Sequence, residues 1–461
     1  DRMFDCPQNL REEEMFEVPE WAANKVVYQI FPSRFAATEP VDKELWYKAP
    51  ITPMDDLHGN LRGIIEHMDD IQNLGIDVLY MTPIFQSNSC HKYDTTDYYQ
   101  IDPSFGTTED LKELVQKAHE RGMKVVLDAV YNHTGREFFA FADILENGEK
   151  SKYRDWYFID GFPLKSEWGE IPNFKCFGYY GGMPKLNLKN PEVEKYITDV
   201  ACYWIKECDI DGWRLDVGDE ISHFFWKNFR KAVKAVKKDM LIIGEIWHYA
   251  GDFLEGDEWD TVMNYPFYLN LIDLLADEKI TVSQFVQNLG YLKGRLHKNC
   301  YPLMWNLIDS HDTARFLHLC NDNKKKQHLA AAFQLLLPGM PMIYYGDEYA
   351  MPGANDPDCR RGMYWDEEYQ DKEMYEWYKR LIQVRKSHAC IVEGELAGSV
   401  TEDEEGTIVL IRKNGEETIA MIFNCSSSAK KFNEYTQKYN LLTENTFDGN
   451  VEGFDAAVIV L

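Results

Sequence analysis

The chain has little that would tie it to a membrane or to nucleic acid. Its 461 residues contain no run of eighteen or more apolar residues, so no transmembrane helix is predicted. The first residues lack the basic and apolar regions of a signal peptide. Basic residues are outnumbered, with 49 Lys and Arg against 77 Asp and Glu and a net charge of −28. Such a charge repels nucleic acid and anionic membrane surfaces and suits a neutral substrate.

Cysteine pairs of the Cys-x-x-Cys type are also absent. The ten cysteines are scattered, and their even number allows disulfides without implying them in a chain of this length. We expect free, mostly buried thiols in a reducing compartment, and therefore a cytoplasmic protein. Secretion remains the alternative, because the chain does not begin with Met and trimming of its N-terminus would account for this. No His and Cys group has metal-ligand spacing, so we expect chemistry that requires no metal or redox cofactor.

The length and composition predict a folded protein with one large domain and smaller additional domains. Hydrophobic residues make up 45% and aromatic residues 14% of the chain, which is ample for a core. Eight short β-rich runs alternate with helical patterns, and this alternation predicts an α/β fold, the (β/α)8 TIM barrel. The runs cover residues 25–31, 78–81, 124–129, 212–217, 241–245, 261–264, 302–308 and 341–345.

Two stretches interrupt or follow this alternation. Residues 134–190 are rich in Gly and aromatic residues, which predicts a subdomain inserted after the third strand. Near the end, two β-rich runs flank Asn414 and Gly415, a strong hairpin signal that predicts a C-terminal antiparallel β-sandwich domain. The expected organisation is an N-terminal segment (1–24), the barrel (25–133 and 191–385), the insertion (134–190) and the β domain (386–461).

Three acidic residues each close an apolar run, where a buried strand meets its loop. They are Asp216, Glu245 and Asp312, and in a barrel they would converge above the C-terminal ends of the strands. An ion pair or a strand-end cap would account for any one of them alone. Together they indicate glycosidic bond cleavage, which needs more than one carboxyl group in different protonation states.

The residues beside these acids fit that chemistry. Arg214 lies two positions before Asp216, so both side chains leave a strand on the same side, and the guanidinium would keep Asp216 ionised as a nucleophile. Glu245 ends an otherwise apolar strand, where a partly desolvated carboxyl has a raised pKa and holds a proton for a leaving group. His311, just before Asp312, could donate a hydrogen bond to a substrate hydroxyl.

Six segments resemble, in order along the chain, the signature segments of the α-amylase family of glycoside hydrolases. They are residues 75–85, 128–133, 212–220, 244–248, 306–312 and 339–348. Residues 183–187, 262–267 and 356–361 are similar to the neopullulanase, cyclomaltodextrinase and maltogenic amylase group within that family. The segment at 183–187 discriminates most, since α-1,6-glucosidases and secreted α-amylases usually carry other residues there.

The resemblance implies a role for each matching residue. Asp216 would be the nucleophile, oriented by Arg214, Glu245 the general acid/base, and Asp312 the residue that stabilises the transition state. The implied substrate-binding residues are His133 and His311 on the hydroxyls of one sugar, Tyr93 stacked on its ring, Asp356 and Arg360 on the next sugar toward the non-reducing end, and Trp247 and His248 on the acceptor side. Taken singly, each of the two histidines and Tyr93 could instead be structural.

The resemblance thus implies a retaining α-glucan hydrolase that cleaves α-1,4 links of maltooligosaccharides, cyclodextrins or pullulan, with transglycosylation open. A glucan transferase or isomerase, such as a trehalose synthase, is the alternative enzyme. A non-catalytic barrel for sugar binding or protein interaction is the other alternative, but such barrels lose acids that are all present here.

Three features depart from the resembled pattern. That group usually has an N-terminal β-sandwich module for dimerisation, whereas only 24 residues precede the first expected run. Either the module was lost or the chain is a fragment, so the oligomeric state stays open. Gly218 and Asp219 stand where an Ala-Asn pair is common. Relatives often bind a structural Ca²⁺ through an Asn/Asp-rich loop, which is here residues 36–40 (AATEP), and calcium is not predicted there.

Overall fold

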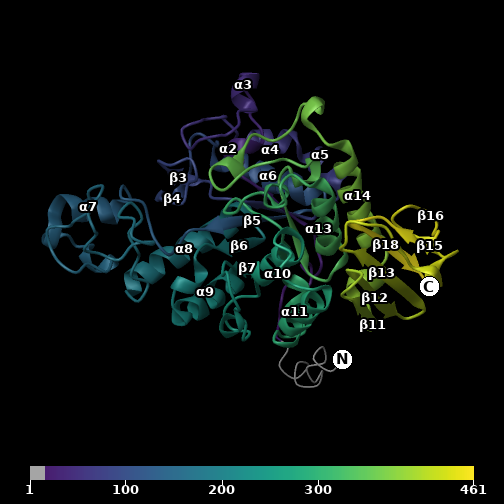
Figure 1. The fold of residues 1–461 in the computed structure, drawn as a ribbon. Helices are drawn as coiled ribbons and strands as arrows, with labels where there is room; N and C mark the ends of the chain where they lie inside the picture. Colours follow the sequence, from purple (N-terminus) through teal and green to yellow (C-terminus); the bar gives the residue numbers. More distant parts are fainter. Residues whose placement is uncertain (1–15) are drawn as a thin grey trace.

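Eight parallel strands close into a barrel at the centre of the molecule (Figure 1). The computed structural model describes residues 16–461, so the first fifteen residues of the expected N-terminal segment, Cys6 included, lie outside the described part. In order round the barrel the strands are β1 (Val27–Ile30), β2 (Val78–Met81), β5 (Lys124–Ala129), β6 (Gly212–Leu215), β7 (Leu241–Gly244), β8 (Thr261–Asn264), β9 (Trp305–Leu307) and β10 (Met340–Tyr344). Each of the eight predicted runs overlaps one strand, and the predicted barrel is confirmed.

Amphipathic helices surround the barrel. The longer ones are α4 (Leu61–Glu66), α5 (Met68–Leu74), α6 (Thr108–Glu120), α8 (Pro191–Cys208), α9 (His223–Val236), α10 (Tyr265–Leu271), α11 (Val282–Gly294), α13 (Lys324–Leu336) and α14 (Lys372–Ser387). Four short helices are α2 (Pro32–Phe35), α3 (Lys43–Trp46), α12 (Phe316–Leu319) and α15 (Cys390–Glu393). Helix α6 shows why they form: Thr107 and Asp110 make a reciprocal capping box, and Leu111, Leu114, Val115 and Ala118 form its buried stripe.

The alternation of residues along each strand decides which side chains enter the barrel. Val126, Ile243, Met263, Trp305 and Met342 pack together in its fully buried interior. In a strand, residues two positions apart point to the same face. The interior row therefore continues from Val126 to Asp128 on β5, and from Ile243 to Glu245 at the end of β7. This alternation of side-chain direction places polar side chains at the C-terminal mouth of an otherwise apolar barrel.

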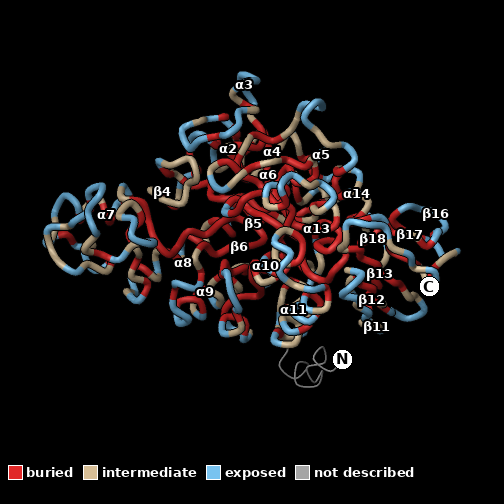
Figure 2. The backbone as a smooth tube through the Cα atoms, in the orientation of Figure 1, coloured by how far each residue is buried: buried red, intermediate tan, exposed pale blue. Residues whose placement is uncertain are grey.

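The insertion after β5 lies at one end of the molecule, and its outer turns are exposed (Figure 2). It contains α7 (Phe139–Asn147), η2 (Gly148–Lys150) and η3 (Arg154–Trp156), followed by irregular backbone. One isolated β-bridge, His133 with Lys185, connects its two ends, and another, Cys176 with Pro184, closes its last turn. A hairpin of β3 (Phe85–Ser87) and β4 (Thr95–Ile101) follows β2.

An antiparallel sheet forms the C-terminal domain, at the opposite end of the molecule from the insertion (Figure 1). Its strands, in sheet order, are β11 (Glu395–Glu402), β12 (Thr407–Asn414), β13 (Glu417–Asn424), β18 (Asp455–Val460), β15 (Tyr439–Asn440) and β16 (Asn445–Thr446). A separate ribbon pairs β14 (Lys430–Lys431) with β17 (Asn450–Val451). The predicted hairpin is present, but its two-residue loop is Gly415 and Glu416, because Asn414 still pairs with Glu417.

Two expectations from the composition, on membrane-spanning helices and on free thiols, can be compared with residues 16–461. No helix within residues 16–461 combines the length and apolar character needed to cross a bilayer. The nine cysteines in this part are free thiols, and five of them are buried: Cys208, Cys300, Cys320, Cys359 and Cys390.

Replacement of a barrel-interior side chain should destabilise the whole protein. Trp305 is fully buried inside the barrel, so Trp305→Ala leaves a large cavity and should lower the free energy of unfolding by about 3–5 kcal/mol. Thermal unfolding followed by calorimetry measures the effect. Trp168→Ala, at a residue that is 98% exposed, is the matched control and should leave the melting temperature nearly unchanged. Equal melting temperatures for the two variants would contradict the interior position of Trp305.

Candidate active site

One buried guanidinium joins three carboxylates at the mouth of the barrel. Arg214 is fully buried, and its Nη1 lies 3.1 Å from both carboxylate oxygens of Asp128 and 3.2 Å from Oδ1 of Asp216. Its Nη2 lies 2.8 Å from Oε2 of Glu245. Because β5, β6 and β7 are neighbours, the three acids that follow or end these strands converge on a single cation. Asp216 and Glu245, two of the three acids singled out by the sequence, therefore contact the same side chain.

Asp128 is the third partner of Arg214, and the sequence analysis gave it no role. It is buried and accepts hydrogen bonds from the hydroxyls of Tyr80 (2.6 Å) and Tyr93 (2.8 Å). Burial raises the pKa of Asp128 to about 6, although Arg214 and the two tyrosine hydroxyls oppose the shift. A signal was present, since Asp128 closes an apolar strand just as the other acids do.

Asp216 and Glu245 influence each other through their shared cation. Burial, and next the negative charge of Glu245, raise the pKa of Asp216 well above its usual value, while Arg214 lowers it. The expectation that Arg214 keeps Asp216 ionised thus captures only one of the opposing effects. The second carboxylate oxygen of Asp216, Oδ2, is buried and accepts no hydrogen bond from the described residues.

The backbone around these acids is constrained by a tryptophan. Val217 follows Asp216 in the left-handed conformation (φ 47°), and its N–H donates to Oε2 of Glu245 at 3.0 Å. A Cβ on Gly218 would lie 2.7 Å from the Trp259 ring, and one on Gly244 would lie 2.2 Å from it. Glycine is thus required at both positions, because the indole packs directly on the backbone beside the two acids.

Asp312 is brought to the same mouth but is less buried. One oxygen lies 3.3 Å from Nε2 of His311 and the other 3.6 Å from Nη2 of Arg360. The side chain of Asp312 is 32% exposed, whereas those of Asp216 and Glu245 are nearly covered. Arg360 also pairs with Asp356 at 2.8 Å, so the two residues expected on the next sugar form one ion pair that adjoins Asp312.

A directional series of hydrogen bonds crosses the barrel mouth. The Gln29 amide donates to Nδ1 of His311 (2.7 Å), and Nε2 of His311 lies 2.8 Å from the Tyr93 hydroxyl, which donates to Asp128. Burial lowers the pKa of His311 well below its usual value, and the positive charge of Arg360 adds to this, so the ring is neutral. The neutral ring, with Nδ1 accepting, must carry its proton on Nε2. The rings of Tyr93 and His311 lie parallel, 5.5 Å apart, at this mouth.

His133 lies close by but uses both ring nitrogens within the protein. Nε2 lies 2.9 Å from the Tyr93 carbonyl oxygen and Nδ1 lies 3.2 Å from the Asn132 amide. Burial lowers the pKa of His133 to about 4, so the imidazole is neutral. Neither nitrogen is left for a sugar hydroxyl in this arrangement, and the observed effect of His133 is to fix the position of Tyr93.

Trp247 and His248 form the rim beyond Glu245. The Trp247 indole N–H donates to Oε1 of Glu245 (3.2 Å), and its ring stacks on Tyr265 with centroids 3.8 Å apart. His248 is mostly exposed and lies 3.4 Å from Asp219, the residue that departs from the common Ala-Asn pair. The two therefore differ, since Trp247 contacts a catalytic candidate and His248 does not.

Lys185, from the discriminating segment at 183–187, also reaches this region. Its Nζ donates to the Glu220 carbonyl oxygen (2.8 Å) and to the side chain of Asn132. The lysine thereby joins the insertion to the loops after β5 and β6. The sequence analysis marked the segment as informative but assigned its lysine no contact.

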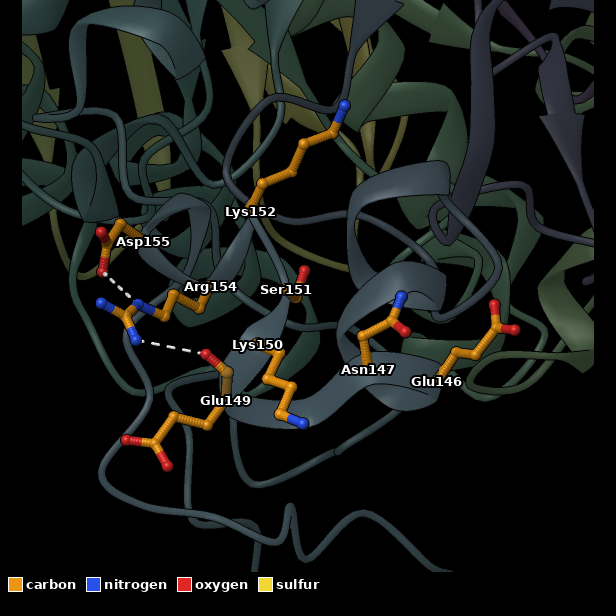
Figure 3. Close-up of a pocket in the computed structure, with 8 residues that line it drawn as sticks. All are labelled: Glu146, Asn147, Glu149, Lys150, Ser151, Lys152, Arg154 and Asp155. Atoms are coloured by element: carbon orange, nitrogen blue, oxygen red, sulfur yellow. Dashed lines mark hydrogen bonds and ion pairs between the residues drawn. The ribbon is translucent and has the colours of Figure 1, made fainter.

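Two further observations bear on ligands. Within residues 16–461, no group of three or more His, Cys, Asp or Glu side chains is arranged to hold a metal ion. A hollow of about 1020 Å³ in the insertion is lined by charged side chains, including Glu146, Lys150 and Arg154 (Figure 3). These side chains come from the end of α7, from η2 and from η3 and do not converge on one point, and Arg154 is engaged with Glu149 and Asp155.

Known proteins share both the sequence and the fold. The chain matches the alpha-amylase family (alpha amylase, catalytic domain) over residues 29–394. A cyclomaltodextrinase from Geobacillus thermopakistaniensis (strain MAS1) is 46% identical over 430 residues, which are 92% of this chain and 73% of that protein. Neopullulanase 2 from Thermoactinomyces vulgaris is 43% identical over 417 residues, 89% of this chain and 71% of that protein.

Solved structures agree with these matches. A cyclomaltodextrinase superposes with a TM-score of 0.92 and 38% identity, covering 97% of this chain and 79% of that one. The ligand-free cyclic α-maltosyl-(1→6)-maltose hydrolase from Arthrobacter globiformis has a TM-score of 0.88 and 35% identity, covering 96% of this chain and 100% of that one. The matched residues span the barrel and every carboxylate described above, and they show that this chain belongs to the α-amylase family of glycoside hydrolases.

Proposed function

We propose that the protein is a retaining α-glucan hydrolase that cleaves α-1,4 links in maltooligosaccharides, cyclodextrins or pullulan. The observation that carries the proposal is the contact of one guanidinium, Arg214, with both Asp216 and Glu245. Retaining enzymes need two carboxyl groups only about 5–5.5 Å apart, whereas inverting enzymes leave room for a water between them. A shared guanidinium fits the shorter separation.

The reaction then uses the two acids in turn. The carboxylate of Asp216 attacks the anomeric carbon while Glu245 gives its proton to the departing glycosidic oxygen, so that a covalent glycosyl-enzyme forms and the first sugar leaves. Glu245, now ionised, takes a proton from a water molecule, and the resulting attack on the anomeric carbon releases the second sugar and frees Asp216. Each attack reaches the anomeric carbon from the face opposite the bond that it breaks. Two such inversions retain the configuration of the anomeric carbon. A sugar hydroxyl in place of water would give transfer.

The remaining residues would orient the sugar rings. Asp312 would accept hydrogen bonds from hydroxyls of the distorted sugar, and the Tyr93 ring would stack on that sugar. His311, whose Nε2 proton faces the Tyr93 hydroxyl, would hold that ring in place. Asp356 and Arg360, already paired beside Asp312, would bind the next sugar, and Trp247 would contact the acceptor.

Cytoplasmic location is the remaining part of the proposal. It is supported by the nine free thiols in residues 16–461. An intracellular maltogenic amylase from Bacillus subtilis is 42% identical over 90% of this chain.

Product analysis tests the central proposal. Cyclodextrin, pullulan, starch and maltotriose are each incubated with the protein, and the first products are followed by proton NMR. Newly formed α-anomers before mutarotation are expected from retention. Appearance of β-anomers first would overturn the retaining mechanism, and disaccharide isomers without free glucose from maltotriose would replace hydrolysis by isomerisation.

Loss of the general acid/base should remove most of the activity without unfolding the protein. For Glu245→Gln we expect kcat/KM to fall by about 10²–10⁴-fold, because a proton donor and acceptor is lost while the side-chain shape is kept. Asp239→Asn changes an exposed carboxylate just before β7 and serves as the matched control. Activity of Glu245→Gln within a few-fold of Asp239→Asn would contradict the assigned role.

The pH dependence should reflect the crowded carboxylates. Asp216 must be ionised to attack, and its pKa is raised, so kcat/KM should fall on acidification at a pH above the ordinary value for Asp. Burial is the largest cause of the raised pKa, and Glu245 is uncharged while it holds the proton for the leaving group, so Glu245→Gln should leave the acid limb close to its original position. Residual activity of Glu245→Gln on an aryl maltoside, whose leaving group needs no proton, measures this limb. An acid limb at the ordinary pKa of Asp in the unmodified protein would contradict the raised pKa of Asp216.

Chelation should leave catalysis unchanged. We infer that the carboxylates and Arg214 carry the chemistry alone and that no structural Ca²⁺ is required. Support comes from the donor set within residues 16–461, and from the loop at 36–40, whose only acid, Glu39, is exposed. Dialysis against EDTA should change neither kcat nor the melting temperature, and recovery of a lost activity by added Ca²⁺ would refute this inference.

A further inference from the structure

The insertion exposes large apolar side chains that the catalytic site does not use. Trp168 is 98% exposed, Tyr179 92%, Ile171 82% and Tyr180 58%. Exposed aromatic rings on this scale are costly for a soluble protein, because apolar surface stays in contact with water. Contiguous patches of this kind mark interaction sites.

Two adjacent turns build this patch. Trp168 and Ile171 come from the turn at residues 166–172, and Tyr179 and Tyr180 from the turn at residues 177–183. The turns are in contact, since a Cβ on Gly181 would lie 3.3 Å from Pro172. Residues of both turns line a cavity of about 680 Å³, together with Arg136. The cavity therefore has aromatic walls and charged groups at its edge.

The turn that carries Tyr179 and Tyr180 is anchored beside the catalytic site. The Phe177 ring lies 5.4 Å from the ring of His133, which holds Tyr93 in place. Phe177 begins the same turn that carries Tyr179 and Tyr180, and the strand-like pairings of Cys176 with Pro184 and His133 with Lys185 fix that turn to the barrel mouth. The turn that carries two rings of the patch therefore begins beside a residue of the barrel mouth.

We propose that the aromatic patch formed by Trp168, Tyr179 and Tyr180 binds an α-glucan chain at a distance from the bond that is cleaved. A sugar ring has an apolar face of C–H groups and a rim of hydroxyls. Aromatic faces match the former, and Arg136, Glu167 and Glu170 at the cavity edge match the latter. The charged hollow around Lys150 on the same insertion offers no such rings.

The site rests on the proposed function for the identity of its ligand and deepens it. A glucan that extends beyond the barrel mouth would meet the patch, whereas a short oligosaccharide would end before it. The patch consequently favours long chains over short ones and should affect substrate binding, not bond cleavage.

The test compares long and short substrates. Trp168→Ala and Tyr179→Ala, singly and together, are assayed on amylose and on maltotriose. Loss of one stacking ring should raise KM for amylose by about two- to tenfold. KM for maltotriose and kcat on both substrates should stay unchanged. Tyr439→Ala, at an aromatic residue 46% exposed in the C-terminal sheet, is the matched control and should change neither KM.

A binding measurement separates this proposal from the catalytic one. Electrophoresis in gels that contain amylose is run with Asp216→Asn as the background, so that the glucan is not cleaved. Retardation by amylose that the double aromatic substitution weakens supports the site, since the catalytic cleft of Asp216→Asn still binds some amylose. If the unmodified protein hydrolyses no glucan, the proposed function fails, while the retardation still reports on the patch.

Three results would overturn the proposal. They are an unchanged KM for amylose with unchanged retardation, an equal rise in KM for maltotriose, and a shift from dimer to monomer in sedimentation velocity without loss of retardation. The last result would identify the patch as a contact between two copies of the chain.

Discussion

A single buried cation organises the mouth of the barrel. Desolvation of a guanidinium is expensive unless carboxylates surround it, and desolvation of carboxylates is expensive without a cation, so Arg214 and its three acids are stable only together. The planar fork of Arg214 directs one nitrogen at Asp128 and Asp216 and the other at Glu245. A lysine would supply the charge but not these directions. The positions of Asp216 and Glu245 thus depend on a residue that is itself fully buried.

A second layer of side chains fixes what Arg214 does not. Gln29, His311 and Tyr93 transmit hydrogen bonds from β1 to Asp128, while His133 holds the backbone of Tyr93. Each of these groups is oriented by the protein before any ligand arrives. Polar groups fixed in advance need no reorganisation during the reaction, and this is the main source of electrostatic stabilisation in enzymes.

The barrel was predictable because buried parallel strands are short apolar runs, whatever the details of their packing. The convergence of Asp216 and Glu245 followed from their shared position at strand ends. The orientation of Arg214 followed from its place two residues before Asp216, on the same face of the strand. Two features depend on which side chains the fold brings together, and no local sequence pattern predicts them. They are the contacts of Asp128 with Arg214 and two tyrosines, and the hydrogen bonds of both ring nitrogens of His133. The same holds for the pKa of Asp216, where burial outweighs the adjacent cation. Small local features also differ: the expected helix at 61–74 divides at His67 into α4 and α5.

The contact of Trp259 with Gly218 and Gly244 has a consequence for how such sites diversify. An alanine at position 218, common in related chains, has no room here while the indole occupies its present place. A larger residue at position 218 therefore requires a smaller residue at position 259, or a different position of the Trp259 ring. Because the same indole packs on Gly244, next to Glu245, an engineer who alters the loop at Gly218 would also disturb that acid, unless the tryptophan is redesigned in the same step.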